Sequence, residues 1–261
     1  GDNPDNVNYA LQYNNRFRIL EKAFHNAKDH RLKERQEFFK KNKSWLEDHA
    51  LFMAIKKDQL DVEWTEWPED LRHHQKKALK EFAENHKNQL EFQYFIQFKF
   101  FEQWETLKNY AHRLGIQLIG DMPIYVAMDS VDVWANADQF LLDDELKPTV
   151  VAGAPPDFFT KEGQRWGNPI YDWDKMKAND YDFWKKRVKI HMDLYDILRL
   201  DHFIGFGNYW SVPAEDETAR NGYWVDGPGM DLFQSLEKEL GPLPFLIEDL
   251  GVLSDKVIDL R

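Results

Sequence analysis

The chain has 261 residues, a length that suits one domain of α/β-barrel size or two smaller ones. Its 46 acidic residues outnumber its 34 basic ones and give a net charge of −12, which disfavours nucleic acid or an anionic membrane surface as the partner. Because cysteine is absent, disulfides, thiolate metal sites and thiol nucleophiles are excluded. With no membrane-spanning apolar run and no signal peptide in the sequence, we expect a cytoplasmic protein with a neutral ligand.

The first part of the chain is predicted to be helical. Residues 1–13 are polar, lack a clear period and begin without Met, so we expect an extended or disordered start. Over 14–115 apolar positions recur at helical spacing among many charges, which predicts a helical subdomain and one barrel helix. Two amphipathic helices are expected over 14–42, and a capping box at Ser44 predicts the start of another. The aromatic stripe of 86–114 indicates a core-facing helix.

Three short apolar runs in the second part of the chain each carry an acid at their end, namely Asp121, Asp201 and Glu248. A helical segment and loops with Gly and Pro separate the last two runs, so the order strand, loop, helix, strand predicts parallel neighbours. In a parallel β/α array the carboxyl ends of the strands meet at one edge, where active sites are found. We therefore expect the three carboxylates at that edge.

The run that ends at Asp201 also contains Arg199. Because side chains alternate along a strand, these two residues share one face, while Leu198 and Leu200 share the other. The guanidinium would keep Asp201 ionised at neutral pH and hold it in one rotamer. A buried structural ion pair is one alternative. A metal site at Asp201 and His202 is another, disfavoured because adjacent strand residues point to opposite faces, so we expect no metal and no cofactor.

A long loop is predicted over 122–178, a region without periodicity that is rich in Pro, Gly, Asp and aromatic residues. Its prolines and glycines restrict the backbone, while several side chains offer hydrogen bonds and ring faces. These side chains are Asp157, Gln164, Trp166, Asn168 and Tyr171. A lining that is both polar and aromatic suits a saccharide. The alternative is a rigid surface loop without a ligand.

Five motifs in this order resemble those of the 4-α-glucanotransferases, or amylomaltases, of glycoside hydrolase family 77 in the α-amylase superfamily. The motifs are Gly120-Asp121-Met122-Pro123-Ile124-Tyr125-Val126, Pro155-Pro156-Asp157, the segment from Gly163 to Tyr171, Arg199-x-Asp201-His202-Phe203 and Ile247-Glu248-Asp249-Leu250-Gly251. The resemblance implies a TIM (β/α)8 barrel with an inserted helical subdomain, of which 116–261 would be the central portion. It also implies retaining transfer of α-1,4-glucan segments between maltooligosaccharides, without a cofactor.

The same resemblance implies roles for individual residues. By position in the motifs, Asp201 corresponds to the nucleophile, Glu248 to the acid/base and Arg199 to the support of the nucleophile. The substrate-binding set would be Asp121, Tyr125, Asp157, Gln164, Trp166, Asn168 and His202. The family's third catalytic Asp lies on a late strand and has no counterpart up to Arg261. We therefore expect the chain to form a partial barrel and to be almost inactive by itself.

The two acids are expected to titrate differently. The guanidinium should hold the pKa of Asp201 down, and the apolar run before Glu248 should raise the pKa of that acid so that it is protonated in the free enzyme. Two alternative functions stay open. One is an α-glucan hydrolase of the same superfamily, and the other is a non-catalytic α-glucan-binding protein. The oligomeric state is not predicted.

Overall fold

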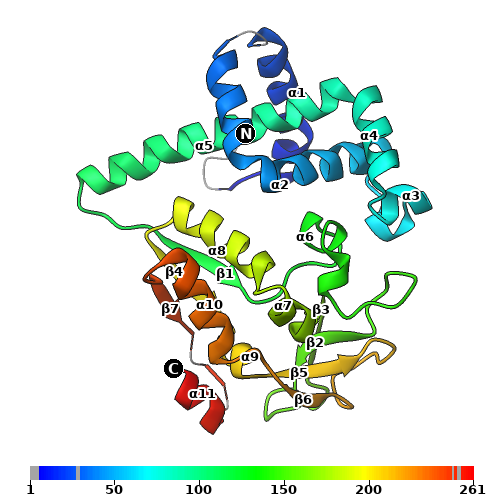
Figure 1. Ribbon diagram of the computed structural model, residues 1–261, viewed down its shortest axis with the longest axis vertical. Coiled ribbons are helices and arrows are strands. Elements are labelled where there is room, and N and C mark those ends of the chain that lie inside the picture. Colours follow the sequence, from blue (N-terminus) through cyan, green and yellow to red (C-terminus); the bar gives the residue numbers. More distant parts are fainter. Residues whose placement is uncertain (1–5, 28–29, 249, 252–253) are drawn as a thin grey trace. The chain divides into compact units, whose positions relative to one another are not determined.

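The computed structural model describes residues 6–27, 30–248, 250–251 and 254–261, so the expectation for residues 1–5 lies outside the described residues. The chain divides into two compact units (Figure 1). One consists of Gly1–Val62 and Trp67–Trp104, and the other of Glu63–Glu66 and Glu105–Arg261. Each unit is described by itself below.

The first unit is built from helices, as the apolar period predicts. It contains α1 (Tyr9–Asn26), α2 (Leu32–Asp58), α3 (Glu69–Arg72), α4 (Lys76–Asn85) and the larger part of α5 (Lys87–Arg113). Aromatic rings fill much of its core. Phe24 of α1 packs against Phe95 of α5 with ring centroids 5.5 Å apart, and both side chains are buried. The aromatic stripe of α5 therefore faces a core rather than a cofactor groove.

Two expectations for this unit are wrong in detail. The helix α1 begins at Tyr9, so residues 9–13 are helical rather than disordered, and the side chain of Asn8 caps the start of the helix. Ser44 lies inside α2, which runs through this position without a break. Serine costs little in a helix interior, and the fully buried Leu46 two residues later keeps this stretch packed on the core.

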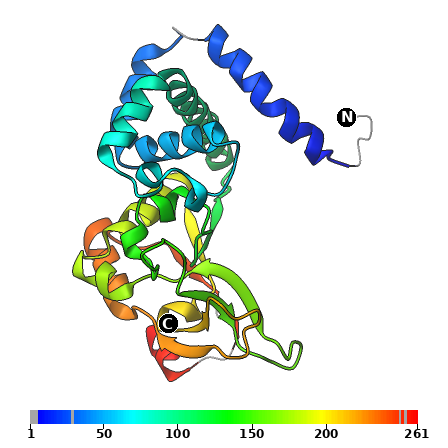
Figure 2. The ribbon, with the colours of Figure 1, turned by 90° about the vertical axis from the view of Figure 1, so that its right-hand side faces the viewer.

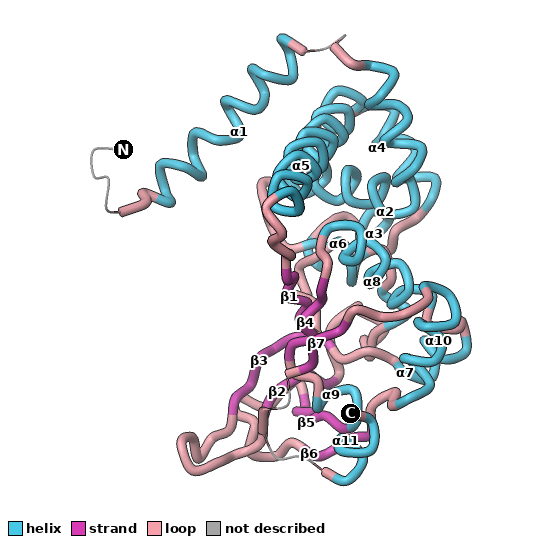
Figure 3. Tube along the Cα trace, turned by 90° about the vertical axis from the view of Figure 1, so that its left-hand side faces the viewer, coloured by secondary structure: helices cyan, strands magenta, loops and turns pink. Residues whose placement is uncertain are grey.

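A parallel sheet of three strands organises the second unit. Its strands β1 (Ile119–Pro123), β4 (Ile197–Asp201) and β7 (Phe245–Ile247) pair in the order β1-β4-β7. The helices α8 (Asp182–Leu194) and α10 (Met230–Leu240) lie along one face of this sheet (Figure 3). The predicted parallel arrangement is confirmed, and these strands form part of a (β/α)8 barrel.

The side chains of β4 alternate as predicted. Leu198 and Leu200 are 0% and 1% exposed, whereas Arg199 and Asp201 are partly exposed on the opposite face. The strand β1 begins at Ile119 and continues past Asp121, which is its central residue rather than its last. Its register pairs Asp121 with Arg199 and places the last residue of β1 beside Asp201.

A second, antiparallel sheet was not predicted. It consists of β2 (Val150–Ala154), β3 (Gln164–Pro169), β5 (Asn208–Pro213) and β6 (Tyr223–Asp226) in the order β3-β2-β5-β6. Figure 2 shows that it joins segments coloured green with segments coloured orange, which lie far apart in the sequence. The expectation of a single loop over 122–178 is therefore wrong. Local periodicity could not reveal the pairing of β2 with β5, whose residues lie more than 50 positions apart and which joins two antiparallel pairs into one sheet.

Short helices complete the second unit. They are η1 (Trp64–Glu66), α6 (Val131–Trp134), η2 (Ala137–Gln139), α7 (Trp173–Ala178), α9 (Ile204–Gly207) and α11 (Asp255–Leu260). Within the part of the chain that the structure describes, no helix combines the length and apolar character needed to cross a bilayer.

Candidate active site

The carboxyl ends of the parallel strands bring one guanidinium and three carboxylates together. Arg199 Nη1 donates to Asp121 Oδ1 at 2.5 Å, while Arg199 Nη2 lies 2.9 Å from Asp201 Oδ1 and 3.1 Å from Glu248 Oε1. The strand register makes this possible, because Asp121 pairs with Arg199 and Glu248 follows directly after β7. The Asp121 hydrogen bond, and then the three negative charges, raise the pKa of Arg199. The prediction that these acids share one edge of the sheet is confirmed.

Glu248 is held by the backbone that follows β4. The His202 amide donates to Glu248 Oε2 at 2.7 Å, and His202 has φ of +53°, in the left-handed region that non-glycine residues rarely adopt. This hydrogen bond, with further contributions from Asp201 and Arg199, lowers the pKa of Glu248. The expectation of a raised pKa is therefore wrong for this structure, because the charged form gains more from these contacts than it loses by partial burial.

An aromatic ring packs on His202, the residue that follows Asp201. The Trp166 and His202 rings meet edge to face with centroids 4.8 Å apart, and the Tyr125 ring lies 6.4 Å from Trp166. Trp166 is 37% exposed, and its Nε1 donates to Gln164 Oε1 at 3.0 Å, so part of the indole surface is open to a ligand. Burial lowers the pKa of His202, which favours the neutral imidazole at pH 7.

The Tyr125 hydroxyl is buried and finds no hydrogen-bond partner among the described residues. Its ring stacks on Tyr171 at 6.1 Å, and burial raises the pKa of Tyr125 well above its ordinary value. A buried hydroxyl without a partner costs about 1–3 kcal/mol. A water molecule or a ligand hydroxyl at this point would recover that cost.

Asn168 and Asp157 contact the backbone instead of the acids. Asn168 Nδ2 donates to Val126 O at 2.9 Å. Asp157 Oδ1 accepts from the amides of Phe159 and Thr160 at 2.9 and 2.7 Å, which closes a turn in an exposed loop. Across the described residues, neither side chain hydrogen-bonds to Arg199 or to the three acids around it. A role in substrate binding therefore stays a prediction for both.

Comparison with known proteins decides the family. A family model described as 4-alpha-glucanotransferase matches residues 2–261. The chain belongs to the 4-alpha-glucanotransferase family. Among named members, the 4-alpha-glucanotransferase of Aquifex aeolicus (strain VF5) is 46% identical and aligned over 97% of this chain and 52% of its own length. That of Clostridium butyricum is 40% identical, over 100% of this chain and 54% of its own.

Solved structures of 4-alpha-glucanotransferase relatives agree. The amylomaltase from Streptococcus agalactiae in complex with acarbose matches with a TM-score of 0.94 and 39% identity, covering 100% of this chain and 53% of that one. The amylomaltase from Corynebacterium glutamicum, at 20% identity and a TM-score of 0.70, shares the fold. The chain spans about half the length of the curated relatives it matches.

One structural contributor to this glucanotransferase-family site was missed from the sequence. Arg187 of α8 donates to the backbone at the end of β1. A charged residue on an amphipathic helix is usually solvent-facing, so no local pattern distinguishes it from its neighbours. In the described residues no cluster of three or more His, Asp or Glu side chains could hold a metal ion. The acids are arranged around Arg199 instead.

Proposed function

We propose that the protein carrying this chain is a 4-α-glucanotransferase that moves segments of α-1,4-glucan between maltooligosaccharides. The observation that supports it most is the sharing of Arg199 Nη2 by Asp201 and Glu248, at 2.9 and 3.1 Å. The two carboxylate oxygens are therefore at most about 6 Å apart, the sum of those distances. This limit lies below the roughly 6.5–9.5 Å of inverting glycosidases and is compatible with the roughly 5–5.5 Å of retaining ones.

The reaction would proceed by double displacement. Asp201 attacks the anomeric carbon of the donor glucan, the glycosidic bond breaks, and Glu248 gives its proton to the departing sugar oxygen. A covalent glycosyl ester on Asp201 remains. In the second step Glu248 takes the proton from a hydroxyl of the acceptor glucan, whose oxygen displaces Asp201 and restores an α-1,4 bond. Arg199, whose Nη2 lies 2.9 Å from Asp201 Oδ1, orients Asp201 for attack.

The lowered pKa of Glu248 adds a condition to this scheme. In the arrangement described here Glu248 carries its charge, which suits the base of the second step. Proton donation in the first step requires the neutral acid. We therefore propose that a bound donor glucan displaces the His202 amide from Glu248 Oε2, which removes the largest contribution to the lowered pKa.

Maltooligosaccharides are the proposed ligands because the partly exposed Trp166 ring packs on His202, the residue whose amide holds Glu248. The Streptococcus agalactiae relative was solved in complex with acarbose, which supports a saccharide as the ligand. We propose the remaining members of the predicted set as contacts to the same ligand. They are Asp121, Asp157, Gln164, Asn168 and His202. A cytoplasmic location stays a prediction that rests on the sequence alone.

Two substitutions in the full-length protein test the assignment of the acids. Asp201→Asn should abolish transfer from both maltotriose and an α-maltosyl fluoride, because no ester can form. Glu248→Gln should slow the reaction of maltotriose by about 10²–10⁴-fold but that of the fluoride much less, because fluoride leaves without a proton. Glu217→Gln, which changes an exposed acid on the loop between β5 and β6, is the matched control.

Each outcome separates the candidate functions. Equal losses on both donors for Glu248→Gln would contradict the acid role. Glucose release without formation of longer chains by the wild type would favour an α-glucan hydrolase. Binding of maltotriose without turnover of either donor would favour a glucan-binding protein.

A further inference from the structure

The backbone that leaves β1 is buried over residues 124–126, which belong to no strand or helix. Residues 123–128, here called the exit segment, run from the end of β1 toward α6. Ile124, Tyr125 and Val126 are 2%, 6% and 7% exposed. Irregular backbone in such a place has neither a strand ladder nor water to pair with, and unpaired buried carbonyls destabilise a fold. The carbonyl groups of the exit segment therefore need donors from elsewhere.

Side chains supply those donors at five of the six exit-segment carbonyls. Arg187 Nη2 donates to Pro123 O at 2.6 Å, and Ile124 O accepts from both Arg187 Nη1 at 3.1 Å and the Tyr171 hydroxyl at 2.7 Å. The other bonds run from Asn168 Nδ2 to Val126 O at 2.9 Å, from Ser130 Oγ to Ala127 O at 2.6 Å, and from Trp64 Nε1 to Met128 O at 2.7 Å. Donors from α8, β3 and η1 thus converge on one short segment.

Arg187 differs from the other donors because it is charged. Its guanidinium lies 4.9 Å from the centre of the Trp184 ring, and among the described residues it contacts no carboxylate. An arginine directed at two successive carbonyls fixes both their direction and their spacing, because its donors are held in one plane. A lysine at this position would offer a single ammonium group on a flexible stem.

The place where Arg187 binds is close to the proposed chemistry. Pro123, the first residue whose carbonyl it holds, pairs with Asp201 across the β1–β4 ladder. Asp121, two residues earlier on β1, contacts Arg199, which in turn holds Asp201 and Glu248. A shift at the end of β1 would therefore reach the acids through the shared guanidinium of Arg199.

We propose that Arg187 is a positioning residue for glycosyl transfer, which fixes the end of β1 so that Asp121 and Arg199 hold Asp201 in line for attack. The inference rests on the proposed function. Arg187 touches neither the reacting carboxylates nor a position for substrate, so its effect passes through the backbone of the exit segment. Small errors in the placement of a reacting group lower rates strongly, and this makes the inference measurable.

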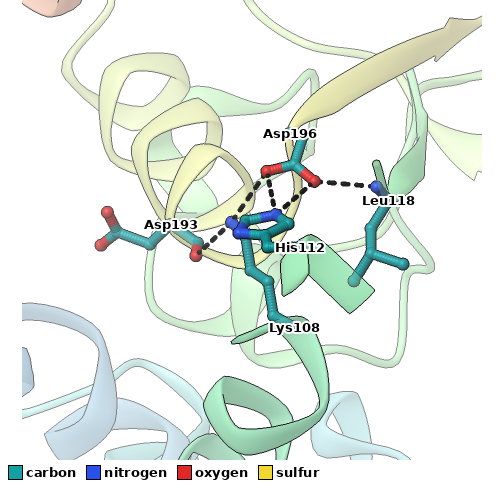
Figure 4. A network of polar contacts seen from close by, with 5 residues as sticks. All are labelled: Lys108, His112, Leu118, Asp193 and Asp196. Carbon is teal, nitrogen blue, oxygen red and sulfur yellow. Dashed lines mark hydrogen bonds and ion pairs between the residues drawn. The ribbon is translucent and has the colours of Figure 1, made fainter. Parts of the chain in front are cut away.

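The test uses the full-length protein with Arg187→Met and Arg187→Lys. Methionine keeps an apolar stem against Trp184 but removes every donor, whereas lysine keeps the charge and one donor group. The matched control is Lys108→Met. It removes a cation that donates to Asp193 O at 3.3 Å near the amino ends of β1 and β4 (Figure 4). All variants are measured for maltotriose transfer, melting temperature and amide hydrogen exchange.

We expect kcat for Arg187→Met to fall about tenfold or more while KM changes by less than about threefold, and Arg187→Lys to recover part of the loss. Lys108→Met should keep the wild-type kcat even where its melting temperature falls equally. Wild-type kcat in Arg187→Met would overturn the inference, as would an equal loss of kcat in Lys108→Met. If the wild type transfers no glucan, the proposed function is wrong, and amide hydrogen exchange then tests the inference about Arg187. Amides of 124–128 should then exchange about tenfold faster in Arg187→Met than in Lys108→Met, and unchanged exchange would overturn the inference.

Discussion

The negative charge of Asp196 should stabilise the second unit. It lies directly before β4, at the amino ends of the strands, and is 17% exposed. Its Oδ2 accepts from the Leu118 amide at 2.8 Å, its two oxygens lie 3.0 and 2.9 Å from His112 Nε2, and Lys108 Nζ stands 3.6 Å away (Figure 4). These contacts tie the starts of β1 and β4 to the last turns of α5.

The magnitude follows from what each substitution leaves behind. Asp196→Asn keeps an oxygen for the Leu118 amide but loses the negative charge. A hydrogen bond to a charged group contributes about 1.5–3 kcal/mol and a neutral one about 1 kcal/mol, so we expect a loss of about 0.5–2 kcal/mol. The longer Lys108 contact should add little. In a domain of 150–250 residues each kcal/mol lowers the melting temperature by about 2–4 °C.

The loss should depend on pH in a defined direction. Partial burial by itself would raise the pKa of Asp196, but the Leu118 amide, His112 and Lys108 outweigh burial and hold the pKa below its ordinary value. A carboxylate with a lowered pKa stabilises the fold above the pKa of the unfolded chain, about 3.9 for Asp. That contribution disappears as the pH falls through the folded-state pKa. The difference between wild type and Asp196→Asn should therefore be largest near neutral pH and vanish in acid.

The assay is a series of thermal melts of both proteins between neutral and acid pH. Asp193→Asn is the matched control, because Asp193 carries an exposed carboxylate three residues away and contributes its backbone carbonyl rather than its side chain to the network. The reasoning would be refuted by equal melting temperatures at neutral pH. A difference in melting temperature between wild type and Asp196→Asn that persists unchanged in acid would show that the charge of Asp196 does not cause it.

Two further predictions concern tryptophans. Trp166→Ala should weaken maltotriose binding about three- to tenfold, the equivalent of an aromatic contact, with little change in melting temperature because the side chain is 37% exposed. Calorimetry would detect this, and a drop in melting temperature with unchanged affinity would make Trp166 a structural residue. Trp64→Phe should cost about 0.5–1.5 kcal/mol because it removes the indole donor to Met128 O, which then keeps only the Ser130 amide, although the ring stays buried. Trp224→Phe, at an exposed tryptophan, is its control, and equal melting temperatures for both variants would contradict this account.

The placement of the acids could be predicted because it depends on local patterns. Alternation along β4 puts Arg199 and Asp201 on one face, and the order of strands and helices puts Glu248 on a parallel neighbour. What could not be predicted is that one guanidinium contacts all three acids. This shared contact depends on the pairing of Asp121 with Arg199, residues 78 positions apart. The sequence of either strand alone does not determine which residues pair.

The direction of the pKa shift of Glu248 could not be predicted from the sequence either. An apolar run before an acid suggests burial and a neutral carboxyl group, and this was the expectation. The structure instead directs the His202 amide at Glu248, from a residue in the left-handed region that no sequence pattern marks. The role of Arg187 could not be predicted either, because its partners are backbone carbonyls. Every residue has a carbonyl, so the sequence does not mark which ones accept from Arg187.

The cluster around Arg199 also has an unbalanced formal charge. With Glu248 ionised, three carboxylates surround one guanidinium, so the group as a whole is negative. A sugar ring that loses its leaving group becomes positively charged at the anomeric carbon and the ring oxygen. In the proposed reaction, this excess of negative charge at the edge of the sheet would favour the positively charged reacting ring over the neutral ground-state sugar.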